Sequence, residues 1–149
     1  MDLIYLDYNC FQRGFDDPQQ TRIQMEALAC QEIFGRAERS EVKLVWSFMY
    51  EDETMLCPFP LRRVEALRLA TICEVRVAPE DSIAQLAKSY QQRVKAGAKD
   101  ALHLACAVSS QAEYFLTCDD KLLRQAKRLK LKFVALNPID YVRKGESSE

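Results

Sequence analysis

The stretch LIYLDYN, residues 3–9, decides the fold of this 149-residue chain. Four apolar residues, 3–6, have the composition of a buried strand, and the run ends at Asp7. A second stretch of this kind, YFLTCDD at residues 114–120, has Asp119 shortly after its apolar run. Because open parallel sheets bind ligands outside the carboxyl ends of their strands, we expect Asp7 and Asp119 at a ligand-binding edge.

The rest of the chain alternates between strand and helix patterns. Further strands are predicted at 43–46, 74–78 and 132–136, and helices at about 19–39, 47–56, 60–72, 79–95, 99–110 and 120–130. A loop with Gly14 and Pro18 is expected after Asp7. This alternation predicts a three-layer α/β/α fold with a mainly parallel central sheet, as a single domain over residues 1–142 with a polar tail at 143–149.

The composition is that of an ordinary soluble domain, with 48% hydrophobic and 29% charged residues. No apolar run approaches the roughly 18 residues of a membrane helix, and the N-terminus lacks the basic flank of a signal peptide. We therefore expect a cytoplasmic protein without membrane contact. The net charge of −1 means that any nucleic-acid contact must come from local basic patches.

The six cysteines do not form a metal or redox motif. No two of them make a C-x-x-C pair, and His103 is the only histidine, so neither structural zinc nor a thioredoxin-like site is supported. Most lie in apolar segments, where a free cysteine behaves as a small core residue. We expect thiols throughout.

Two further acids could point at the same sheet edge as Asp7 and Asp119. Asp100 opens the apolar helix KDALHLACA, residues 99–107, where an unpaired charge would be destabilising unless the helix N-terminus or a bound cation compensates it. Glu53 lies near the middle of the helix that Ser47 is expected to cap.

Each acid also has an ordinary structural explanation. Asp7 could cap or turn the loop after the first strand, and Asp119 could cap the helix that starts at residue 120. Glu53 could be a solvated helix residue, and Asp100 could stabilise the helix dipole or pair with the preceding lysine. Their joint placement is the stronger observation. Four oxygen ligands without a His or Cys cluster suit Mg²⁺ or Mn²⁺, and such an ion could activate water against a phosphodiester.

Four motifs, taken in order, resemble the PIN-domain family. They are LDYN (6–9), SFMYEDE (47–53), KDALHLACA (99–107) and FLTCDDKLL (115–123), and together they span nearly the whole chain. The resemblance implies a PIN-like fold and a metal-dependent ribonuclease, of the type that includes toxins of toxin–antitoxin pairs. It also implies an antitoxin partner and a homodimer as options. An inactive PIN-like module that binds nucleic acid or protein is the alternative, whereas a receiver-like domain would need a different order of acids.

The resemblance also assigns roles to residues. It implies that the catalytic, metal-binding carboxylates are Asp7, Glu53, Asp100 and Asp119. Supporting polar residues would be Asn9 and Thr117, and Asp120 is the alternative if the last ligand is shifted by one.

Other features depart from the family pattern or allow more than one interpretation. Glu51 is an alternative to Glu53, which is preferred by its spacing from Ser47. Tyr8 replaces the smaller residue often found between the Asp and the Asn. Arg13 and Lys121 are the candidate substrate contacts, while the other cations after Asp119 fit an ordinary solvated helix face. His103, three residues after Asp100 on the same helical face, could hydrogen-bond a carboxylate or contact substrate, and a satisfied histidine at the core edge is the preferred interpretation.

Overall fold

A computed structural model describes residues 1–146 of the chain. Five parallel strands form one sheet in the order β3-β2-β1-β4-β5. The strands are β1 Leu3–Leu6, β2 Lys43–Ser47, β3 Val75–Val77, β4 Tyr114–Leu116 and β5 Val134–Leu136. The α-helices are α1 Tyr8–Gln12, α2 Thr21–Glu38, α3 Phe48–Leu56, α4 Pro60–Ala70, α5 Asp81–Val94, α6 Ala98–Ser109, α7 Asp120–Leu129 and α8 Pro138–Glu146, with a 3-10 helix at Arg13–Phe15. The predicted class of a parallel α/β fold is confirmed.

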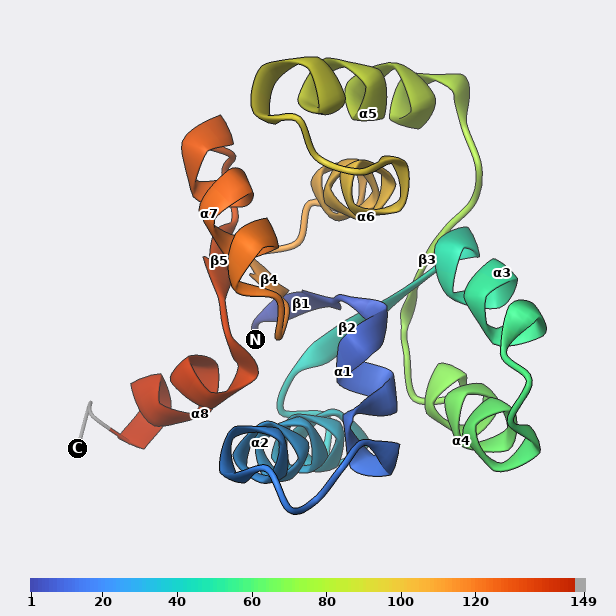
Figure 1. Ribbon diagram of the computed structural model, residues 1–149, viewed down its shortest axis with the longest axis vertical. Coiled ribbons are helices and arrows are strands. Elements are labelled where there is room, and N and C mark those ends of the chain that lie inside the picture. Colours follow the sequence, from blue (N-terminus) through green and yellow to red (C-terminus); the bar gives the residue numbers. More distant parts are fainter. Residues whose placement is uncertain (147–149) are drawn as a thin grey trace.

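Helices cover both faces of the sheet (Figure 1). In this view α2 and α8 pack together below it, and α5 and α6 pack together above it. The α3–α4 pair lies at the β3 side and α7 at the β5 side. Within residues 1–146, no helix is long and apolar enough to cross a membrane.

The two strands predicted to carry the acids are neighbours at the centre of the sheet. Leu6 is in register with Leu116, and both side chains are buried. The Asp7 amide donates to the Leu116 carbonyl (2.8 Å), so the pairing continues one residue past β1. The carboxyl ends of β1 and β4 therefore present residue 7 beside residue 117.

Two segments differ from the sequence prediction. The loop expected after Asp7 begins instead with α1 and the 3-10 helix, because the Asp7 side chain accepts from the Tyr8 amide and caps a short helix. The helix α8 was not predicted, and the expected domain boundary at residue 143 falls inside it. Of the predicted tail, residues 147–149 lie outside the described part.

The cysteines are free, as expected. Five of the six are buried, Cys57 is half-buried, and the described residues contain no disulfide.

Candidate acidic site

Asp7 lies at the carboxyl end of β1 with only 7% of its surface exposed. One carboxylate oxygen accepts from the Tyr8 amide (2.8 Å), and the other accepts from the Thr117 hydroxyl (2.7 Å) and the Asn9 amide (3.1 Å). Burial raises the pKa of Asp7, and Glu53 raises it further, while the His103 charge and the Thr117 hydrogen bond oppose this shift. No Lys or Arg side chain pairs with Asp7 within residues 1–146.

Asn9 of α1 and Thr117, which directly follows β4, both donate hydrogen bonds to this carboxylate. The Asn9 side chain donates to Thr117 Oγ1 (3.2 Å) as well as to Asp7, and its oxygen accepts from the Cys118 amide (3.3 Å). Thr117 is fully buried, and its oxygen also accepts from the Asp119 amide (3.1 Å). Asn9 and Thr117 thus surround Asp7 with polar partners, where the sequence predicted supporting residues.

Asp100 lies in the first turn of α6 and is half-buried. Its carboxylate has no hydrogen bond or salt bridge within residues 1–146, so the suggested pairing with Lys99 does not form. Burial raises the pKa of Asp100 most, followed by the charges of Asp7 and Asp119. Glu53 contributes in the same direction, and the His103 charge opposes it. The four predicted acids therefore interact electrostatically at one edge of the sheet.

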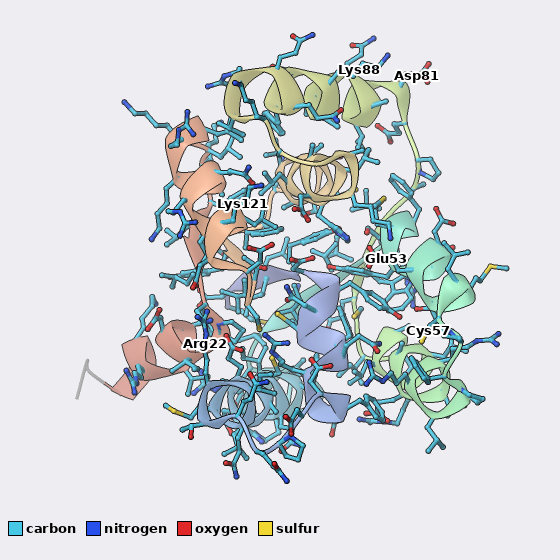
Figure 2. The ribbon with its side chains drawn as sticks, viewed as in Figure 1. Arg22, Glu53, Cys57, Asp81, Lys88 and Lys121 are labelled. Carbon is cyan, nitrogen blue, oxygen red and sulfur yellow. The ribbon has the colours of Figure 1, made fainter. Side chains whose placement is uncertain are left out.

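The side chains of the two glutamates of α3 point in different directions. Glu53 lies on the side of α3 that faces α6 (Figure 2), and its carboxylate is 2.5 Å from His103 Nε2. Glu51 is exposed and instead accepts from the Trp46 indole (3.3 Å). Only Glu53 is thus directed toward Asp7 and Asp100.

A buried chain of hydrogen bonds runs from β2 to Glu53. The Ser47 hydroxyl contacts the Tyr5 hydroxyl (2.8 Å), which contacts His103 Nδ1 (2.7 Å), and His103 Nε2 contacts Glu53. With a neutral imidazole, Nε2–H donates to Glu53 and Nδ1 accepts from Tyr5. Burial opposes protonation of His103, but the Glu53 hydrogen bond and the charges of Asp7, Glu53 and Asp100 outweigh it and raise the pKa.

Asp119 lies at the exposed rim of the site and caps α7. Its carboxylate accepts from the amides of Lys121 (2.9 Å) and Leu122 (3.3 Å), which is the ordinary structural role considered for it. Asp120, the alternative ligand, is bound by the Arg22 guanidinium (2.7 and 2.8 Å). Asp119 rather than Asp120 therefore interacts with Asp100.

The two candidate substrate contacts are in different situations. Arg13 donates to Asp16 (2.8 Å) and to Glu26 (3.0 Å), so its guanidinium is already paired inside the fold. Lys121 is exposed on α7 and forms no salt bridge within residues 1–146. Lys121 alone of the two is therefore available to a ligand without breaking an internal ion pair.

The four predicted acids have the type of ligand atom that a hard cation prefers, but their carboxylates do not surround a single position. Their donor atoms are all carboxylate oxygens, and they include the half-buried, unpartnered Asp100. Within residues 1–146, however, no three His, Cys, Asp or Glu side chains are close enough together to hold an ion as they stand. Glu53 is bound to His103, and Asp119 is bound to two amides of α7. Holding an ion therefore requires side-chain rotation.

Sequence reasoning missed most of the polar framework behind the acids. Tyr5 lies inside an apolar strand, where its hydroxyl gives no periodic signal. Ser47 was predicted as a helix cap, and it does occupy that position, but its hydroxyl makes no capping bond and contacts Tyr5 instead. Arg22 and Glu26 lie on α2, far from every motif, yet Arg22 holds both Asp120 and the Cys118 carbonyl (3.3 Å).

Comparisons with known proteins identify a shared fold. No family model matches the chain, and no curated protein matches its sequence. Among solved structures, the chain is similar to FitAcB from Neisseria gonorrhoeae, with 17% sequence identity and a TM-score of 0.59. The match covers 91% of this chain and 97% of that chain. FitAcB comprises a PIN-domain toxin with its antitoxin. The chain therefore has a PIN-like fold.

Proposed function

We propose that this chain is a divalent-metal-dependent endoribonuclease that hydrolyses RNA phosphodiester bonds at the acidic site. The observation that carries the proposal is the half-buried Asp100 carboxylate, which has no cationic partner and whose pKa is raised by Asp7, Asp119 and Glu53 after the effect of burial. A fold gains no stability from grouping carboxylates in this way, whereas a bound cation would remove the repulsion. The PIN-like fold supports the same reaction class.

The ion would be held by Asp7, Glu53, Asp100 and Asp119. When bound, Mg²⁺ or Mn²⁺ supplies an activated water and neutralises charge on the phosphodiester. The chain's own residues set the geometry. Asn9 and Thr117 fix one oxygen of Asp7, and the Ser47–Tyr5–His103 chain fixes Glu53. Lys121, exposed at the start of α7, would contact a phosphate of the substrate.

Purified protein is expected to cut single-stranded RNA internally when Mg²⁺ or Mn²⁺ is supplied and to stop when a chelator is added. The physical reason is that Thr117 and Tyr5, the hydroxyls paired with Asp7 and His103, are fully buried, so a bound ion would be needed to activate water. The measurement is the size distribution of an end-labelled RNA over time. Cleavage that continues at the same rate in excess chelator would contradict the metal requirement.

We also propose that the chain forms a complex with an antitoxin protein. Six large apolar side chains on α3, α4 and the turn between them are each more than half exposed: Met55, Leu56, Phe59, Leu61, Val64 and Leu67. We call these six residues the α3–α4 apolar surface. Met55 and Leu67, from different helices, line the same surface pocket. Monomeric proteins rarely expose large apolar patches unless a partner covers them. The likeness to FitAcB, a toxin–antitoxin complex, supports a partner of this kind.

Val64→Ser with Leu67→Ser is expected to weaken such a complex at least about tenfold, because each change removes an apolar contact of about 1 to 2 kcal/mol. The partner to test is the product of a small reading frame next to the gene. Leu28→Ser, an exposed apolar change on α2, is the matched control. If the double variant instead converts a homodimer into a monomer in light scattering, the surface is the dimer interface and the antitoxin assignment is wrong.

A further inference from the structure

The positive charge of the chain is concentrated on α5, α6 and α7. From Asp81 to Lys132 the sequence has ten Lys or Arg and five Asp or Glu, a formal charge of +5, although the whole chain has −1. The other residues therefore carry −6. The sequence pI of about 5.9 conceals this division.

All ten of these cations are exposed, and none forms a salt bridge within residues 1–146. We call them the cationic surface: Lys88, Arg93, Lys95, Lys99, Lys121, Arg124, Lys127, Arg128, Lys130 and Lys132. Figure 2 labels one cation on each outer helix, Lys88 of α5 and Lys121 of α7.

Outside this segment, seven Lys or Arg side chains form salt bridges. On α2 and after it, Arg36 pairs with Glu32 and Arg39 pairs with Glu41. On α4, Arg68 pairs with both Glu65 and Glu38. A surface that only keeps a protein in solution mixes both signs in this manner. Unpaired cations on three successive helices instead leave a positive field that attracts an anion.

The cations of α5 and α7 belong to one surface because the two helices are joined at their C-terminal ends. The Arg93 guanidinium donates to the Leu129 carbonyl (3.5 Å), and the Gln125 amide donates to the Val94 carbonyl (3.4 Å). Two of these cations are also close in sequence to the acids: Lys99 directly precedes Asp100, and Lys121 is two residues after Asp119, whose carboxylate accepts from the Lys121 amide (2.9 Å). A chain of phosphates on α7, which is about 15 Å long, would thus end beside the carboxylates.

We propose that the cationic surface binds the phosphate backbone of a single RNA strand and directs it into the acidic site. The surface has positive charge but few exposed aromatic side chains, so it suits phosphate contacts rather than recognition of bases. The identity of the strand as RNA rests on the proposed function, because DNA has the same backbone charge.

The test measures binding of a labelled single-stranded RNA by fluorescence anisotropy in excess chelator, where cleavage is not needed. The variant is the triple change Arg124→Gln, Lys127→Gln and Arg128→Gln, which removes three charges from α7 and keeps helix propensity. The matched control removes three charges from the C-terminal end of α2 and the start of β2, with Arg36→Gln, Arg39→Gln and Lys43→Gln. Circular dichroism and thermal unfolding verify that both variants fold.

We expect the α7 variant to bind RNA at least about tenfold more weakly than the wild type, while the control changes affinity less than about twofold. For the α7 variant, the slope of log affinity against log salt concentration should be shallower by about 2 than for the wild type. Each phosphate contact on a single strand contributes roughly 0.7 to this slope, and the variant lacks three such contacts. Equal affinities of the two triple variants, or no binding by the wild type at low salt, would overturn the proposal.

Other probes separate the possible ligands. Single-stranded DNA of the same sequence should show a similar salt slope, and a clear preference for DNA would contradict the assignment to RNA. Displacement of RNA by polyglutamate at equal charge concentration would mean that the surface recognises acidic chains in general, and would overturn the assignment to nucleic acid. If the wild type binds RNA but never cleaves it, and the α7 variant binds RNA more weakly, then the RNA-binding surface is supported and only the proposed ribonuclease reaction is wrong.

Discussion

Replacing Asp100 by Asn is expected to slow RNA cleavage by about a thousandfold, equivalent to about 4 kcal/mol of transition-state stabilisation. The carboxylate is half-buried at the acidic site and makes no hydrogen bond or salt bridge within residues 1–146. Substitution by the uncharged isostere therefore removes its charge without breaking an internal contact. The measurement is the single-turnover rate with saturating Mn²⁺.

The same variant should be more stable than the wild type in chelator. Burial and the neighbouring acids raise the pKa of Asp100 in the folded chain above its ordinary 3.8. Ionisation is thus less favourable in the folded than in the unfolded state, and the wild type loses stability as the pH rises through the raised pKa. The advantage of Asn, about 1 kcal/mol at most after solvent screening, should be full at neutral pH and absent below the ordinary pKa.

An Asp100→Asn variant that cleaves more slowly but is more stable than the wild type has lost chemistry and not its fold. Asp52→Asn is the control, because Asp52 is an exposed acid on α3 next to Glu53 in sequence. Asp7→Asn should abolish cleavage as well, but it places an amide donor among the Asn9 and Thr117 donors and should lower stability. Wild-type rates in both the Asp7 and the Asp100 variants would show that the acidic site is not where RNA is cut.

Replacing Glu26 by Ala is expected to lower the free energy of unfolding by about 3 to 5 kcal/mol. Glu26 is fully buried, and its carboxylate accepts from Arg13 (3.0 Å), Arg22 (3.2 Å) and Asn137 (2.6 Å). Removing it leaves two guanidinium groups and an amide without their shared acceptor. Urea unfolding followed by tryptophan fluorescence measures the change.

The Glu26→Ala substitution should also affect the acidic site. Arg22 holds Asp120 and the Cys118 carbonyl, so losing its contact with Glu26 loosens the turn that carries Asp119. Glu26→Gln should cost less than Ala because the amide keeps an acceptor. Glu32→Ala, which removes an exposed partner of Arg36, should cost less than about 1 kcal/mol. A Glu26→Ala variant no less stable than Glu32→Ala would mean that this buried group contributes nothing.

The sequence was most informative where one periodic pattern determined an element. The apolar runs before Asp7 and Thr117 predicted β1 and β4, and parallel pairing then required their carboxyl ends to meet. The sequence did not predict the direction in which a side chain on a helix points. Glu51 and Glu53 differ only in which side of α3 they occupy, and that depends on how α3 packs against α6.

Elements without their own apolar period were missed. The helix α1 has five residues and exists because Asp7 caps it, which no periodicity can indicate. Glu26 occurs in a polar part of α2, and its complete burial depends on Arg13 and on Asn137, a residue 111 positions away. Long-range polar contacts of this kind have no local signature, which is why the framework behind the acids emerged only with the structure.

The position of β1 in the sheet has a consequence for the synthesis of the protein. The first strand to leave the ribosome is the central one, and it needs both β2 and β4 as neighbours. Asp7 acquires Thr117 as its partner only after a further 110 residues have been translated. Under the proposed function, a nascent chain would therefore leave its own messenger RNA uncut until Thr117 has left the ribosome, because the acidic site is incomplete before then.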